Sequence, residues 1–112
     1  MKEFEKFLEE GKVQERTSKP DQAENLIRKA RKRFEHAEER SLGEGNADLI
    51  LEDVYEAIRE AVEAHMLRAG YKSYNHEASI IYAFEELGLK YSQVNNLNRF
   101  RRLRNDSKYR GE

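Results

Sequence analysis

The sequence contains no cysteine, no tryptophan and a single proline among its 112 residues, and no two of its six glycines are adjacent. Without cysteine the chain forms no disulfide and offers no thiolate for nucleophilic or metal chemistry, which is typical of a reducing compartment. Without a glycine-rich segment it has no phosphate-binding loop. Because no apolar run approaches the ~18 residues of a membrane span, the sequence predicts neither a transmembrane helix nor a signal peptide. We therefore expect a cytoplasmic protein without a membrane partner.

Charged residues dominate what is present. They make up 38% of the chain, the mean hydropathy is −1.03, and the net charge is only −1. A chain of this length and polarity buries a modest core, yet the near-zero net charge and the well-spread phenylalanines and tyrosines argue against disorder. Long stretches of helix-forming residues predict one small all-α domain.

Breaker residues divide the chain into expected helices. The apolar residues between the breakers recur at three- and four-residue steps, which is the helical period. We expect helices over 1–10, 20–42, 47–69, 76–87 and 93–108. Gly70 is expected to end the third, Asn75 to cap the fourth and Ser92 to cap the fifth. These predict an antiparallel up-and-down bundle of four to five helices over residues 20–112, preceded by a short helix and lead-in over 1–19. The expected core residues are Phe34, Val54, Ile58, Val62, Ile81, Phe84, Leu97 and Phe100.

The histidines do not form a local site. His36 and His76 are expected at the surface, and His65 falls on the apolar stripe of its helix, where a core or interface position is favoured over a ligand role. No pair of histidines has the i, i+4 spacing of a helical zinc site. The sequence therefore predicts neither a metal site nor a bound cofactor.

The last expected helix carries an unusual arginine. Arg104 continues the apolar stripe of Leu97 and Phe100, where a bundle normally has Leu or Ile. A buried guanidinium is costly unless it is paired, so Arg104 needs an acid from the acidic third helix, a second copy of the chain, or a ligand phosphate. Snorkelling of Arg104 at the edge of the bundle is the structural alternative.

Positive charge gathers at the same end of the chain. Residues 93–112 hold six basic and two acidic side chains, whereas residues 1–92 hold 15 basic and 20 acidic ones. A local basic patch of this kind favours nucleic acid or another anionic ligand. The residues expected to bind it are Arg99, Arg101, Arg102, Lys108 and Arg110.

The segment Leu103-Arg104-Asn105 … Tyr109-Arg110-Gly111 resembles the HEPN superfamily, whose members carry an Arg-x4-6-His motif with a polar residue after the Arg. It is similar to branches in which Tyr replaces the His. The segments 55–60, 66–73 and 76–78 are similar to the paired helices and loop of those proteins, so the resemblance covers about residues 20–111.

This resemblance implies a dimeric helical bundle in which two motifs meet across a two-fold axis and, in active members, cleave RNA without metal. Arg104, Asn105 and Tyr109 take the places of the motif residues. A phenol with a pKa near ~10 is a poor base at neutral pH, so we expect RNA or nucleotide binding with little cleavage. Arg104 and Tyr109 are about 140° apart on a continuous helix. Either the helix ends near Lys108, or each residue meets a partner from another chain.

Three functions remain open at this point. The first is a HEPN-like homodimer that acts with a minimal nucleotidyltransferase in a toxin–antitoxin-like or nucleotide- and RNA-binding module. The second is a metal-independent HEPN ribonuclease, and the third is a non-catalytic helical interaction domain.

Overall fold

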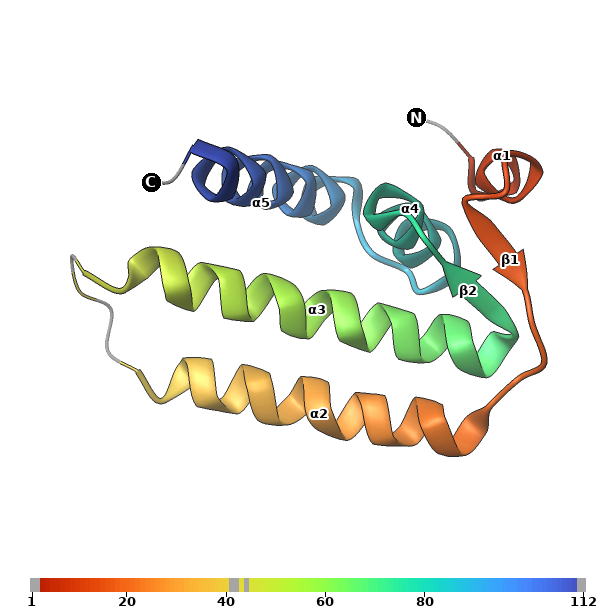
Figure 1. Ribbon diagram of the computed structural model, residues 1–112, viewed down its shortest axis with the longest axis horizontal. Helices are drawn as coiled ribbons and strands as arrows, with labels where there is room; N and C mark the ends of the chain where they lie inside the picture. The colour runs from red at the N-terminus through yellow and green to blue at the C-terminus, as the bar shows by residue number, and fades with distance from the viewer. Residues whose placement is uncertain (1–2, 41–42, 44, 111–112) are drawn as a thin grey trace.

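The computed structural model describes residues 3–40, 43 and 45–110, with side chains described as far as residue 105. The chain is mainly helical, as predicted (Figure 1). The helices are α1 (Phe4–Glu9), α2 (Pro20–Glu38), α3 (Ala47–Ala69), α4 (His76–Glu86) and α5 (Tyr91–Arg110), and the strands are β1 (Val13–Glu15) and β2 (Tyr71–Ser73). No helix in the described ranges is both long and apolar enough to cross a membrane.

Several helix ends follow from local chemistry. Pro20 occupies the first turn of α2, where its missing N–H has no intrahelical partner to lose. Gly70 ends α3 with a φ of 93°, a left-handed conformation that favours glycine. Asn75 caps α4, because its side-chain oxygen accepts a 2.9 Å hydrogen bond from the Ala78 N–H. The predicted roles of Gly70 and Asn75 are confirmed, whereas Ser92 is no cap because α5 begins at Tyr91.

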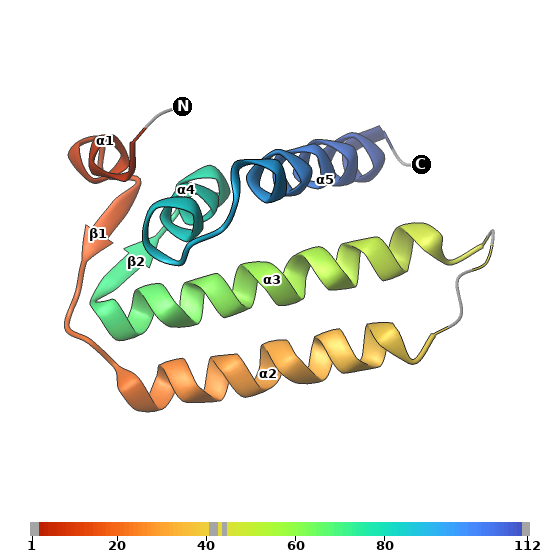
Figure 2. The same cartoon turned by 180° about the vertical axis from the view of Figure 1, so that it is seen from behind.

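Helices α2 and α3 form a long antiparallel pair. Figures 1 and 2 show α3 in the middle of the molecule, with α2 along one side and α4 and α5 on the other. The contact between α2 and α3 uses buried residues at seven-residue spacing, and all but one of them are alanines, which lets the two backbones approach closely. These buried residues are Ala23, Ala30 and Ala37 on α2 and Ile50, Ala57 and Ala64 on α3.

Two short strands, which the sequence did not predict, form an antiparallel ribbon. Val13 pairs with Ser73 and Glu15 pairs with Tyr71. The ribbon closes beside Gly70, whose carbonyl accepts a 2.7 Å hydrogen bond from the Arg16 N–H. A Cβ atom at Gly70 would lie 2.8 Å from the Arg16 carbonyl oxygen, so this close approach also requires glycine.

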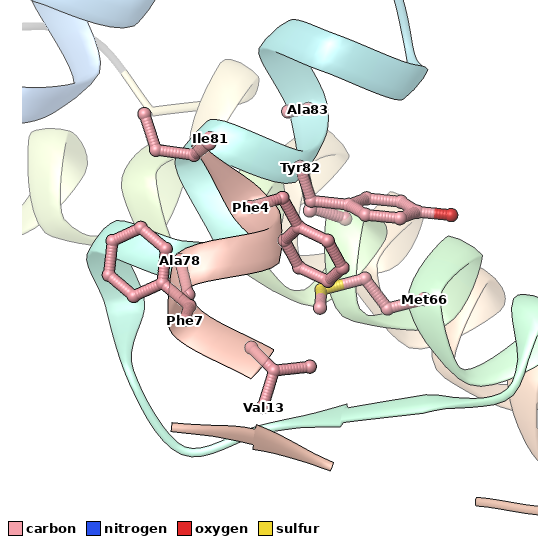
Figure 3. Close-up of a cluster of buried hydrophobic side chains, with 9 residues drawn as sticks. Phe4, Phe7, Val13, Met66, Ala78, Ile81, Tyr82 and Ala83 are labelled. Atoms are coloured by element: carbon pink, nitrogen blue, oxygen red, sulfur yellow. The ribbon is translucent and has the colours of Figure 1, made fainter. Parts of the chain in front are cut away.

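The first core cluster joins the N-terminal segment to the helices (Figure 3). Phe4 and Phe7 from α1 and Val13 from β1 pack against α3 and α4, and the Phe4 ring meets the Tyr82 ring edge-on with centroids 5.1 Å apart. The α3 and α4 members are Val62, Met66, Ala78, Ile81, Tyr82 and Ala83.

The second core cluster lies between α3, α4 and α5. Tyr55, Ile80, Val94 and Leu97 are buried there. Ile58, Phe84 and Phe100 pack against them while remaining partly exposed, as does Leu89. This cluster holds α5 against α3, and α5 then runs past it along the N-terminal half of α3 in the opposite direction (Figure 1).

The expected core residues are buried to different degrees. Val62, Ile81 and Leu97 are buried as predicted, and Val54, Ile58, Phe84 and Phe100 are half-buried. Phe34 is 41% exposed, because α2 packs almost entirely against α3 and buries only the line of Ala23, Ala30 and Ala37, which we call the alanine seam. His65 is exposed, because the buried side of α3 runs through Val62 and Met66, so it is not a core residue. The interface position that the sequence also allowed for His65 stays a prediction.

Candidate functional site

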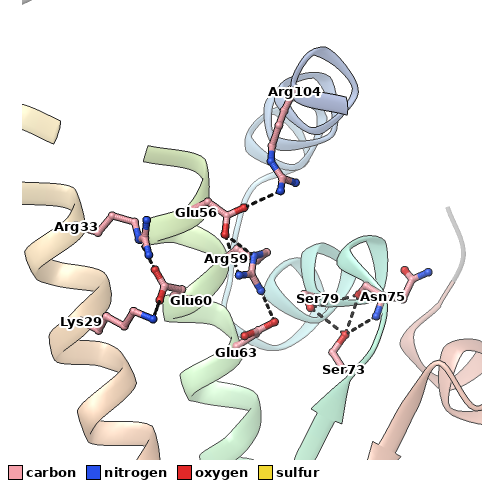
Figure 4. Close-up of polar contacts among 10 residues, drawn as sticks. All are labelled: Lys29, Arg33, Glu56, Arg59, Glu60, Glu63, Ser73, Asn75, Ser79 and Arg104. Carbon is pink, nitrogen blue, oxygen red and sulfur yellow. Dashed lines mark hydrogen bonds and ion pairs between the residues drawn. The ribbon is translucent and has the colours of Figure 1, made fainter. Parts of the chain in front are cut away.

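Arg104 lies between α5 and α3, with 17% of its side chain exposed. Its Nη2 atom is 3.3 Å from Oε1 of Glu56 (Figure 4). Its Nε atom is 3.8 Å from Oε1 of Glu52. The guanidinium also lies over the Tyr55 ring, with Cζ 5.6 Å from the ring centre. Of the three partners that the sequence left open, the structure shows an acid from α3.

Glu56 is shared between two arginines. Its Oε2 atom accepts hydrogen bonds from Arg59 Nη2 at 2.8 Å and Arg59 Nε at 3.1 Å, and Arg59 Nη1 donates to Glu63 Oε1 at 2.5 Å. Burial acts to raise the pKa of Glu56, but the Arg59 hydrogen bond and the charges of Arg59, Arg104 and His76 outweigh it and hold this pKa below its usual value. Glu56 is therefore ionised at neutral pH and holds Arg104 in place.

Tyr55 is the buried ring beneath the Arg104 guanidinium. Its side chain is 3% exposed, and its hydroxyl finds no hydrogen-bond partner within the described part of the chain. Burial raises the pKa of the Tyr55 phenol, against the opposing charges of Arg101 and Arg104. The phenol is thus a neutral, buried ring onto which charged groups from the neighbouring helix pack.

His76, the first residue of α4, lies beside the Tyr55 ring. The two ring centres are 6.4 Å apart, and His76 is half-buried. Burial lowers the pKa of His76, and the positive charges of Arg59 and Arg104 lower it further, while Glu56 and Glu63 oppose them. Its imidazole is therefore predominantly neutral at pH 7. We call Tyr55, Glu56, Arg59, His76 and Arg104 the Arg104 cluster.

Sequence reasoning did not include His76 in the site. His76, Tyr55 and Arg104 lie on three different helices, and no local motif links them. A polar residue in the first turn of a capped helix is expected at the surface. The contact of His76 with Tyr55 depends on how α4 crosses α3, which the sequence does not show. The one sequence signal that included His76 was the segment 76–78 of the family resemblance, and that resemblance gave His76 no role.

The other predicted site residues divide by exposure. Arg101 and Asn105 are half-buried on α5, whereas Arg99 and Arg102 are exposed. The four therefore do not line one face of the helix. The side chains of Asp106 to Arg110 lie outside the described residues, so the roles expected for Lys108, Tyr109 and Arg110 stay predictions.

The two arginines of the Arg104 cluster are already paired with carboxylates. The guanidinium groups of Arg59 and Arg104 are matched by the carboxylates of Glu56 and Glu63, and the more exposed Glu52 lies at the edge beside Arg104. A phosphate that approaches Arg104 therefore competes with Glu56 for the same guanidinium. Among the described residues, no group of three or more His, Cys, Asp or Glu could hold a metal ion.

A second ion-pair group lies on the opposite side of α3 and joins it to α2 (Figure 4). Glu60, with 5% of its side chain exposed, pairs with Arg33 Nε at 2.5 Å and with Lys29 Nζ at 3.3 Å. Arg40 pairs with Asp53 nearer the turn between the helices. These contacts flank the alanine seam, and their role is to fix the α2–α3 pair on which the Arg104 cluster is built.

No protein-family model, curated protein or solved structure gives a significant match to the chain.

Proposed function

We propose that this chain is a HEPN-like domain that binds single-stranded RNA or a nucleotide as a homodimer, with a minimal nucleotidyltransferase as its partner protein. The observation that carries the proposal is the position of Arg104. Its guanidinium is held over Tyr55 by Glu56. It lies on the same helix as the exposed Arg99 and Arg102. An oriented guanidinium suits bidentate phosphate binding.

The course of α5 supports a site built from two copies. The helix is described as far as Arg110, so position 109 lies within it. Positions 104 and 109 are then about 140° apart on one helix, and a second chain is needed to bring them to one ligand. Exposed apolar side chains on α3 and α5 offer surface for contact with a second chain. They are Leu49 (57%) and Leu51 (44%) on α3, and Leu103 (56%) on α5.

The charge distribution confines the proposed RNA binding to the arginines of α5. A net charge of −1 gives no long-range attraction toward RNA, so affinity has to come from the arginines of α5. If about four phosphates are contacted, log affinity for a single strand falls with log salt at a slope near −3. We expect weak binding with little dependence on base sequence, because phosphate contacts carry none.

The test is fluorescence anisotropy with a labelled oligouridylate over a range of salt concentrations. The triple variant Arg101→Gln, Arg102→Gln, Arg104→Gln should weaken binding at least about tenfold and flatten the salt slope. A matched variant removes the same charge from α2, by changing the exposed Arg28, Arg31 and Lys32 to Gln. It should bind nearly as tightly as the wild type. Binding that is indifferent to salt, or that falls equally in both variants, would leave the chain as a helical interaction domain.

A further inference from the structure

The outer face of the β1–β2 ribbon carries exposed basic and aromatic side chains. Successive side chains of a strand point to opposite faces, and Val13 points into the first core cluster, so Gln14 points outward. Lys72 pairs with Gln14 in the register and lies on the same face. Arg16 and Tyr74 follow two residues later on each strand. We call Gln14, Arg16, Lys72 and Tyr74, which are all exposed, the ribbon face.

The alternation continues one residue beyond each strand. The Arg16 N–H donates to the Gly70 carbonyl at 2.7 Å, and the Tyr74 N–H donates to the Lys12 carbonyl at 2.8 Å, so both ends of the ribbon keep the ladder of an antiparallel pair. Arg16 and Tyr74 therefore belong to the ribbon face, and the positions of their backbones are fixed.

The Tyr74 ring is held by two cations. Arg16 Nη2 donates to the Tyr74 hydroxyl at 2.8 Å and to Gln14 Oε1 at 2.7 Å. Lys72 Nζ lies over the ring, 5.9 Å from its centre. These contacts orient the ring, which remains 58% exposed. The ring is therefore a flat apolar surface, held in place, with positive charge beside it.

The charges of the ribbon face are not matched by carboxylates. Arg16 bonds only to neutral groups, and neither Arg16 nor Lys72 forms an ion pair with a residue in the described ranges. Lys12 lies opposite Tyr74 in the ladder, but its Nζ is 3.1 Å from Oε2 of Glu10. An anion can therefore bind at the ribbon face without displacing a carboxylate, whereas at Arg104 it has to compete with one.

The ribbon face combines the two features of a surface that holds single strands, which are an aromatic ring for stacking and basic groups for the backbone. We propose that it binds single-stranded nucleic acid, with one base stacked on Tyr74 and the phosphates on either side of that base bound by Arg16 and Lys72. The inference goes beyond the proposed function, because it adds a second contact surface that does not use α5.

The two surfaces are far apart. Figures 1 and 2 show β1 and β2 at one end of the molecule and the C-terminal end of α5 at the other. Neither stacking nor phosphate binding at the ribbon face involves the 2′-hydroxyl or the edge of a base. We therefore expect equal affinity for ribose and deoxyribose strands and little dependence on base sequence.

A tryptophan reporter measures stacking at position 74. The chain has no tryptophan, so Tyr74→Trp places a single fluorophore there and keeps a ring that can stack. Tyr91→Trp is the matched control, because Tyr91 is 60% exposed and no described cation lies over its ring. Tetra-adenylate should quench the fluorescence of Tyr74→Trp in a saturable way and leave that of Tyr91→Trp nearly unchanged. Equal quenching of both variants, or no quenching of Tyr74→Trp, overturns the inference.

The cations are tested in the Tyr74→Trp background. Two phosphate contacts give a salt slope of about −1.4 for a single strand. Arg16→Gln with Lys72→Gln should therefore weaken the affinity for tetra-adenylate about 25-fold at 0.1 M salt, the factor that this slope gives between 0.1 M and 1 M. Arg31→Gln with Lys32→Gln removes the same two charges from the exposed face of α2 and should have little effect. Equal weakening in the two double variants would refute the role of Arg16 and Lys72.

Three further probes identify the ligand class. Adenosine 5′-monophosphate has one base and one phosphate, adenosine has a base without a phosphate, and tetraglutamate has negative charge without a base. Each should bind at least about fivefold more weakly than tetra-adenylate, the factor that one lost phosphate contact gives at 0.1 M salt. Equal affinity for adenosine 5′-monophosphate would show a mononucleotide site, and equal affinity for tetraglutamate would show a peptide site. Either result contradicts a strand-binding surface.

A last comparison separates this inference from the proposed function. Adding Arg101→Gln, Arg102→Gln and Arg104→Gln to Tyr74→Trp should leave quenching by tetra-adenylate nearly unchanged. Quenching that disappears with these substitutions would rule out the ribbon face as a separate surface. Quenching that persists in a chain that fails the α5 test would support the ribbon face and remove the proposed role of α5.

A second measurement uses the wild type alone, in case Tyr74→Trp does not fold. In amide NMR spectra, tetra-adenylate should shift the signals of Gln14, Lys72 and Tyr74 and leave those of Arg31 and Lys32 on α2 in place. Ribbon signals that do not respond to tetra-adenylate overturn the proposal.

Discussion

Glu56→Gln should increase the affinity of the chain for RNA. In the structure Glu56 pairs with Arg104 at 3.3 Å and accepts two hydrogen bonds from Arg59, so its carboxylate occupies the guanidinium that a phosphate would use. Glutamine has the same shape and can still accept from Arg59, which keeps its second partner Glu63. The substitution therefore removes a competing negative charge with little change in packing.

The size of the effect follows from Coulomb's law. A phosphate on the free edge of Arg104 would lie roughly 7 Å from the Glu56 carboxylate, where the repulsion is between about 0.6 and 2.4 kcal/mol for an effective dielectric constant of ~80 to ~20. Screening by salt is modest at this separation, since the Debye length is ~10 Å at 0.1 M. We expect affinity to rise about fivefold at low salt, which corresponds to about 1 kcal/mol.

Anisotropy with a labelled oligouridylate measures the change, and Glu24→Gln is the matched control. Glu24 pairs with Arg28 at 2.9 Å on the exposed face of α2, so its substitution alters the net charge equally and also releases an arginine. Glu24→Gln should leave the affinity nearly unchanged. Equal gains in both variants would mean that only net charge matters. Unchanged or weaker binding by a folded Glu56→Gln variant would refute the proposal that Arg104 binds the phosphate.

Two further predictions concern the scaffold. Arg33→Met should cost about 2 to 3 kcal/mol of unfolding free energy in urea titrations. This is less than the ~3 to 5 kcal/mol for breaking a fully buried pair, because Arg33 is 34% exposed and Glu60 keeps a lysine partner. Arg28→Met, at an exposed pair, should cost less than about 1 kcal/mol. Equal losses would show that burial of Glu60 is unimportant. Gly70→Ala should lower the melting temperature more than Gly11→Ala, because both have positive φ but only Gly70 has a backbone oxygen 2.8 Å from the added Cβ atom. Similar melting temperatures for the two variants would contradict that close approach.

Sequence reasoning succeeded where the deciding interactions are local. The C-terminal end of α3 depends on Gly70 and the start of α4 depends on Asn75, each with its immediate neighbours, so both were predictable. The need of Arg104 for a partner was also predictable, because a guanidinium on an apolar stripe requires one wherever the helix packs.

The missed features depend on contacts between distant segments. Strands β1 and β2 are three residues each and pair across the whole of α2 and α3, so neither shows an alternating pattern of its own. Phe34 is exposed because α2 has essentially one neighbour, which its own periodicity does not reveal. His76 joins Arg104 through Tyr55, a contact that exists once α4 and α5 are both packed on α3.

The account depends most directly on a second copy of the chain, because positions 104 and 109 of one continuous α5 cannot face the same ligand. Sedimentation equilibrium at tens of micromolar, a range that detects weak dimers, measures this. We predict a mass about twice 13.3 kDa that returns to the single-chain value in Leu103→Glu, whose substituted side chain is exposed and should not disturb folding. A wild type that remains strictly monomeric over this range would contradict the composite site.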